Sequence, residues 1–182
     1  MPKLLISLST VLLLTASIPS QAAPQLTSVY TSLEEGNCKT LEANEDEAGW
    51  YKGRCKGISG YNLLLMEGDL RQTLTIVDPK NKEFPLDLWS TVSSGFSSLG
   101  AKAEWRVKKQ GNKTIPVALI VRFNASENPE KPEQTTSYLV VSKITNNEMC
   151  VTDVVKPNAK ANEQARALAD QAANKACKAQ PT

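Results

Sequence analysis

The chain of 182 residues contains no histidine, and this absence excludes several common catalytic sites. A Ser-His-Asp triad and a Cys-His pair both need an imidazole as the base. The histidine-ligated zinc sites of many hydrolases are excluded for the same reason. The Gly-x-Ser-x-Gly and Ser-x-x-Lys motifs are also missing, as are the glycine-rich loops that bind phosphate. The composition therefore gives little support to catalysis.

The chain also lacks an excess of charge and has only one long apolar run. Its 21 basic and 19 acidic side chains leave a net charge of +2. Such a balance does not favour nucleic-acid binding, which needs a concentrated basic footprint. The only extended apolar run lies within the first 22 residues, so no transmembrane segment is expected in the mature chain.

The first 22 residues have the features of a secretory signal peptide. A short start with Lys3 precedes the apolar stretch Leu4–Ile18, and Ser20 and Ala22 supply the small residues before a cleavage site. We therefore predict that residues 1–22 are removed, that the mature chain starts at Ala23, and that residues 23–182 form a single exported domain. The expected location is periplasmic or secreted.

Four cysteines, an even number, favour two disulfides in an exported chain. Three pairings are possible, and we favour Cys38–Cys55 with Cys150–Cys177 because each pair is close in sequence. The sequence has no Cys-x-x-Cys pair and no histidine, so a metal site is not expected. No cofactor is expected either.

Alternating apolar and polar residues predict several strands. They are expected over residues 61–66, 70–77, 103–108, 115–123, 137–144 and 149–155. The glycine-containing and acidic stretch between Cys38 and Cys55 is interpreted as a loop. Alanines at helical spacing from Ala161 through Cys177 predict a C-terminal helix. The expected fold is α+β: an antiparallel sheet of five or six strands, with the C-terminal helix packed on it and two disulfides.

Carboxylates provide the one catalytic class that the composition permits. Two suitably spaced acids can hydrolyse a glycosidic bond. The candidates on or beside predicted strands are Glu67, Asp69, Asp87 and Glu104. Any chain of this length has such acids on its surface, and the ordinary interpretation is that they are solvated.

A binding surface is a second possibility. Asp69 and Arg71 share one face of a predicted strand, while Glu104 and Arg106 share one face of another. If these strands pair, the two arginines lie side by side, and guanidinium groups suit carboxylate or phosphate ligands. The alternative is a salt-bridged, solvent-facing side of a sheet.

Four aromatic residues fall in predicted loops, namely Trp50, Tyr51, Trp89 and Phe96. Exposed loop aromatics often mark contact sites for proteins or sugars. The tryptophans also fit the role of buried core anchors.

Short motifs spread over most of the chain resemble those of a group of small exported bacterial proteins with four cysteines and no assigned function. They are Cys38, residues 54–57, Gly60-Tyr61, residues 67–71, Glu104-Trp105-Arg106, residues 120–123, residues 139–143, Cys150, residues 161–170 and Cys177. The resemblance implies a periplasmic or secreted bacterial protein built on the four-cysteine frame. It assigns no role to any residue.

These observations favour a non-catalytic binding or inhibitor-type module over an enzyme. Inhibition of a lysozyme is one concrete version, by analogy alone. The alternative is a small carboxylate-dependent hydrolase acting on cell-wall or other glycans. The expected partner is an exported protein or a small anionic ligand, recognised by Asp69, Arg71, Glu104 and Arg106.

Overall fold

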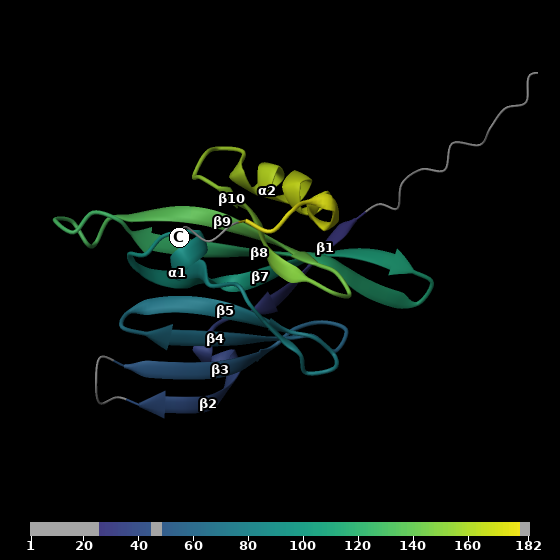
Figure 1. The fold of residues 1–182 in the computed structure, drawn as a ribbon, viewed down its shortest axis with the longest axis horizontal. Helices are drawn as coiled ribbons and strands as arrows, with labels where there is room; N and C mark the ends of the chain where they lie inside the picture. The colour runs from purple at the N-terminus through teal and green to yellow at the C-terminus, as the bar shows by residue number, and fades with distance from the viewer. Residues whose placement is uncertain (1–25, 45–48, 179–182) are drawn as a thin grey trace, which may run out of the picture.

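The computed structural model describes residues 26–44 and 49–178, which fold into a β-rich domain (Figure 1). Its strands are β1 (Thr27–Ser32), β2 (Cys38–Asn44), β3 (Trp50–Lys56), β4 (Asn62–Gly68), β5 (Arg71–Val77), β6 (Glu83–Pro85), β7 (Phe96–Gln110), β8 (Lys113–Ser126), β9 (Thr135–Ile144) and β10 (Met149–Val155). The helical elements are η1 (Glu35–Asn37), α1 (Leu88–Thr91), α2 (Ala161–Ala169) and η2 (Ala172–Asn174).

All ten strands belong to one mixed sheet with the main order β10-β9-β8-β7-β5-β4-β3-β2. β1 pairs with β7, and β6 pairs with β5. Neighbours run antiparallel except β5 and β7, which are parallel where Arg71 meets Ser97. The predicted fold class, an α+β domain with five or six antiparallel strands, is therefore wrong.

The missed strands carry weak sequence signals. β2 is exposed at every position except Cys38, because it lies at the edge of the sheet. Because β2 has no buried face, its sequence does not alternate between apolar and polar residues. The β2 half of the Cys38–Cys55 hairpin therefore has a sequence typical of a loop. Residues 45–48, which connect β2 to β3, lie outside the described part of the chain.

The sheet bends so that two sets of strands face each other across one core. Leu63 and Leu74 come from β4 and β5, and they share a buried cluster with Leu119 and Phe123 of β8. In Figure 1 the strands from β10 to β2 follow one another from top to bottom in the order in which they pair. Trp105 is fully buried in this cluster, and its indole Nε1 donates a hydrogen bond to Thr31 Oγ1 at 2.9 Å. This contact fastens β1 to the core.

A second buried cluster lies under α2, on the other side of β8 and β9. Ala165 and Ala169 of the helix meet Ile120 and Val141 there. The expected helix through Cys177 is wrong in length, since α2 ends at Ala169 and a short 3₁₀ turn follows. Cys177 is bonded to Cys150 of β10. A straight helix from Ala161 to Cys177 would carry Cys177 past this strand, so the chain turns back after α2.

The two favoured disulfides are confirmed. Cys38 and Cys55 are direct partners in the β2–β3 hairpin, and Cys150 joins β10 to Cys177. No free cysteine remains among the described residues. None of the described helices has the length and hydropathy needed to cross a bilayer. The predicted signal peptide, residues 1–22, lies outside the described residues.

Candidate functional site

The structure places Arg106 in a buried network beneath α2. Its Nε and Nη2 donate hydrogen bonds to the two carboxylate oxygens of Asp170, at 2.7 and 2.9 Å. Its Nη1 donates to Ser28 Oγ at 2.6 Å, and Nη2 also reaches the Leu26 carbonyl at 3.1 Å. The side chain is only 9% exposed. Arg106 therefore joins β7 to β1 and to the end of α2.

Glu104 extends the same network along β7. Arg166 of α2 donates from Nε to Glu104 Oε1 at 2.6 Å, and Ser28 donates to the same oxygen at 2.5 Å. Arg166 also donates to the hydroxyl of Tyr30. Burial by itself would raise the pKa of Glu104, but the hydrogen bonds from Arg166 and Ser28 outweigh it and hold the pKa below its usual value. Glu104 is therefore ionised and committed to a structural contact.

Arg71 lies in a different cluster. It pairs with Asp69 across the turn between β4 and β5, and its Nε donates to the Ser94 carbonyl at 2.9 Å. Its guanidinium lies 4.9 Å from the centre of the Phe96 ring. The cross-strand partner of Arg71 on β7 is Ser97, nine residues before Arg106. The structure therefore pairs Asp69 with Arg71, and it joins Glu104 and Arg106 indirectly, through the Ser28 hydroxyl that both contact. It does not place the two arginines side by side.

The Arg71 cluster marks one end of the sheet, which we call the Phe96 end. It comprises the turn 69–70, the segment 93–96 and the β8–β9 connection 127–134. A row of paired residues crosses the sheet there: Trp50, Gly68, Arg71, Ser97, Ala125 and Thr136. Segments far apart in the sequence thus form one continuous surface.

Large apolar side chains are exposed at the Phe96 end. Leu70 is 55% exposed, Phe96 is 45% exposed and Trp50 is 41% exposed. Asp69 and Leu70 both have positive φ, at 50° and 55°, in the two-residue turn between β4 and β5. This conformation is costly for a branched residue such as leucine, so the turn holds an apolar side chain in solvent at an energetic cost.

Two hollows flank Phe96 in this surface. One has a volume of about 520 Å³ and lies between Arg71, Ser93, Glu127 and Pro129. The other, of about 270 Å³, is lined by polar side chains that include Gln72 and Asn124. Phe96, Ser126 and Pro132 line both hollows, which are therefore neighbours.

The charge of the Phe96 end is negative. Its acidic side chains are Asp69, Glu127, Glu130 and Glu133, and its basic ones are Arg71 and Lys131. Glu67 and Arg122, of opposite charge, lie beside it on β4 and β8. The positive charge of Arg71 is already paired with Asp69. A small anion would therefore approach a surface whose field opposes it.

The four candidate carboxylates of the sequence do not share a hollow. Glu67 lines the smaller hollow beside Phe96, where Gln72 donates to it at 2.7 Å. Asp69 is in the β4–β5 turn, Asp87 precedes α1, and Glu104 is under α2. In residues 26–44 and 49–178, five of the best-formed hollows are each lined by no more than one carboxylate. Glu104, with its lowered pKa, is also unsuited to act as a general acid.

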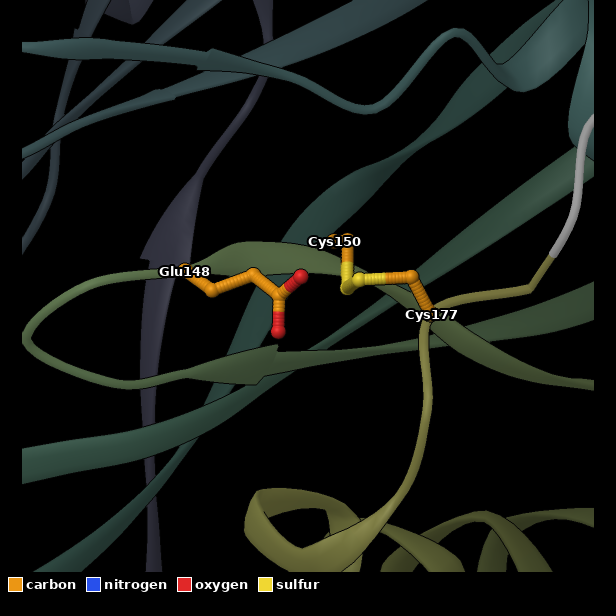
Figure 2. A group of neighbouring side chains, drawn as sticks. All are labelled: Glu148, Cys150 and Cys177. Atoms are coloured by element: carbon orange, nitrogen blue, oxygen red, sulfur yellow. A yellow bond between two sulfur atoms is a disulfide. The ribbon is translucent and has the colours of Figure 1, made fainter.

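One group of potential metal ligands occurs among the described residues, and Figure 2 shows it. Ligand atoms of Glu148, Cys150 and Cys177 lie within 4.8 Å of one another. The two sulfurs are bonded to each other, so neither is a thiolate. Glu148 pairs with Lys143 at 2.5 Å. The group therefore offers a metal ion no more than one carboxylate, which is already engaged.

Sequence reasoning missed Arg166 and Asp170, the partners of Glu104 and Arg106. Both sit on or just after α2, four residues apart, so they lie on one side of the helix and its last turn. The four-residue spacing indicates that Arg166 and Asp170 lie on the same side of the helix. It does not indicate that their partners lie on β7. The four aromatics expected in loops lie in regular elements instead: Trp50 and Tyr51 in β3, Trp89 in α1 and Phe96 at the start of β7.

Comparison with models of protein families, with curated proteins and with solved structures finds no match for this chain.

Proposed function

We propose that this chain is an exported, non-catalytic binding module, and that it binds a basic surface of another exported protein through the Phe96 end. The observation that carries the proposal is the set of exposed apolar side chains at the Phe96 end, together with the net negative charge of that end. Leu70, Phe96 and Trp50 are available to fill pockets on a partner, as the central anchors of protein interfaces do. The location, periplasmic or secreted, rests on the predicted signal peptide and is compatible with the two disulfides.

The charge of the Phe96 end favours one of the two expected partners. Acidic side chains such as Glu130 and Glu133 are exposed around the apolar ones, and a rim of one sign steers a partner of the opposite sign. A small anionic ligand would need an unpaired cation, whereas Arg71 is paired with Asp69 and Arg106 is paired with Asp170. A basic protein surface is therefore the better match.

The mode of binding also favours a protein over a buried small ligand. The two hollows beside Phe96 are open at the surface, and they adjoin each other along the sheet end. Small-molecule sites usually enclose most of their ligand. A protein loop can occupy both hollows at once while its flanks contact Leu70 and Trp50.

The test is site-specific photo-crosslinking in the producing cell, with the crosslinking residue at position 96 or, as a control, at position 41. Leu41 is a matched position, because it is 40% exposed but lies on the edge strand β2. We expect a stoichiometric adduct with a basic exported protein from position 96 only. Adducts of equal yield from both positions, or no adduct from position 96, would contradict the proposal.

Binding of the captured partner is then measured with purified proteins. Leu70→Ala and Phe96→Ala should each weaken binding by about thirtyfold, which corresponds to the loss of about 2 kcal/mol typical of an interface anchor. Leu41→Ala, the matched control, should leave binding unchanged. Glu130→Gln with Glu133→Gln should slow association and reduce its dependence on salt. A partner whose affinity is insensitive to all of these changes does not bind at the Phe96 end.

A further inference from the structure

The hairpin between β7 and β8 extends beyond the rest of the sheet. β1 pairs with β7 only as far as Val107, and β9 pairs with β8 only from Ala118 onwards. Beyond these points, and among the described residues, residues 108–110 pair in the sheet only with residues 113–115. We call residues 108–113 the lysine arm. Ser59 contacts the base of the arm, where its hydroxyl donates a hydrogen bond to the Thr114 carbonyl at 2.6 Å.

The lysine arm is basic throughout. Lys108, Lys109 and Lys113 are its charged residues, and Gln110, Gly111 and Asn112 form its tip. Lys109 and Lys113 are exposed, and Lys109 Nζ donates to Thr114 Oγ1 at 2.5 Å. No acidic side chain lies in the arm to neutralise them.

The arm and the Phe96 end lie at opposite ends of the strands. β7 starts at Phe96 and finishes in the arm, while β8 starts in the arm and finishes next to Glu127. Figure 1 shows the tip of this hairpin at one side of the molecule and the β8–β9 connection at the other. The molecule therefore carries a basic projection at one end and an acidic, hollowed surface at the other, although its net charge is small.

We infer that the lysine arm of one copy binds the Phe96 end of a second copy, so that copies associate head to tail. The inference rests on the proposed function, because it uses the same surface and names an occupant for it. The arm carries three lysines, and the 520 Å³ hollow beside Phe96 is lined by Glu127 as well as by Arg71, whose charge is paired with Asp69. Exposed Glu130 and Glu133 follow Glu127 in the same connection. Complementary charge therefore favours this occupant.

The contact has two consequences. It is heterologous, since two different surfaces meet, and each copy in a pair keeps one free arm and one free Phe96 end. It also competes with any other basic partner for the Phe96 end. As the protein concentration rises, the arm should therefore occupy more of the Phe96 ends and leave fewer of them available to another partner. Contacts between exposed charges are screened by salt, so association should be strong only at low ionic strength.

The experiment is sedimentation velocity of the mature protein over a range of concentrations in 10 mM and 500 mM NaCl. The wild type should show a weight-average sedimentation coefficient that rises with concentration at low salt and stays constant at high salt. Two charge-reversed variants test the contact. Lys109→Glu with Lys113→Glu reverses the arm, and Glu130→Lys with Glu133→Lys reverses the Phe96 end. Each variant alone should associate at least about tenfold more weakly than the wild type, because attraction becomes repulsion at two positions.

Mixing the two variants provides the decisive result. The basic arm of one then faces the acidic end of the other, and the acidic arm faces the basic end, so association should return in the mixture. Lys80→Glu with Lys82→Glu is the matched control, since it makes the same charge change in a different turn and should leave association intact. Loss of association in this control, or no recovery in the mixture, would overturn the inference.

The outcomes separate this inference from the proposed function. A wild type that stays monomeric at low salt refutes the head-to-tail contact. If position 96 still crosslinks to a basic exported protein in that case, the proposed function stands without it. Self-association that survives both charge reversals means that the copies meet elsewhere, which also refutes the inference.

Discussion

Replacing Arg106 by methionine should destabilise the fold, because it removes the guanidinium that joins β7, β1 and the end of α2. Methionine keeps an unbranched stem of similar length, so the change isolates the polar contacts from packing. The four hydrogen bonds lost go to Asp170, Ser28 and the Leu26 carbonyl. Breaking a fully buried ion pair costs about 3–5 kcal/mol.

The loss of stability should be smaller for Arg106→Met than for a fully buried ion pair, because Asp170 is partly hydrated. The side chain of Asp170 is 35% exposed, so water can solvate its carboxylate once the guanidinium is gone. We therefore expect the free energy of unfolding to fall by about 2–3 kcal/mol. For a domain of this size the corresponding drop in Tm is roughly 4–12 °C.

The assay is urea unfolding at pH 7 with the disulfides intact, followed by tryptophan fluorescence and far-UV circular dichroism. Coincident transitions by the two probes and an unchanged m value would justify a two-state comparison. Arg122→Met is the matched control, because Arg122 is exposed and donates a single hydrogen bond to Ser137. It should change stability by no more than about 0.5 kcal/mol.

A double-mutant cycle with Asp170→Asn checks the cause. If the ion pair is the source of the effect, the double variant should be little less stable than Arg106→Met alone, which gives a coupling energy of about 1–2 kcal/mol. Arg106→Met with the stability of the wild type, or fully additive losses in the cycle, would refute the assignment of Arg106 to the structural network.

Two further predictions concern other contacts. Glu104→Gln should be less stable than the wild type at pH 7 and should lose this disadvantage at acid pH. The pKa of Glu104 is lowered in the folded state, so its stabilisation is present above its unfolded value of about 4.5 and disappears as the pH falls through the folded value; a stability difference that stays constant from pH 7 to pH 2.5 would contradict this. Gly53→Ala should destabilise by about 1–3 kcal/mol, because the added Cβ would lie 2.2 Å from the hydroxyl of Tyr51 and 2.6 and 2.8 Å from its Cζ and Cε1 atoms. In the background of Tyr51→Ala, which removes the whole ring, Gly53→Ala should cost less in the same urea assay, and an equal cost in both backgrounds would place the strain elsewhere.

Local sequence patterns predicted those parts of the fold whose signal is contained in a few consecutive residues. The apolar alternation over residues 115–123 corresponds to β8, where Leu119, Val121 and Phe123 enter the main core. The strand predicted over 149–155 coincides with β10. The helix and the Cys150–Cys177 bridge were predicted together, but the bridge limits the helix to Ala169 because Cys177 must reach β10.

The strands near the N-terminus show why local patterns were insufficient. β1 is partly buried, through its pairing with residues 102–107 of β7, about 75 positions later in the chain. β2 is almost fully exposed and is held by its pairing with β3 and by the Cys38–Cys55 bridge. Neither strand has the alternating pattern that marks a half-buried strand, so both were missed.

The sequence alone determined the constraints that depend on residue type: the absence of histidine-based chemistry, the even set of cysteines and the export-like N-terminus. Tertiary structure decided which charges are engaged and which surface is exposed. Arg71 and Arg106 occupy similar places in two alternating strands, yet one lies at the Phe96 end and the other is buried under α2. The reason is that a strand's pattern states which residues share a face, whereas pairing register and packing, set by contacts between distant segments, decide what covers that face.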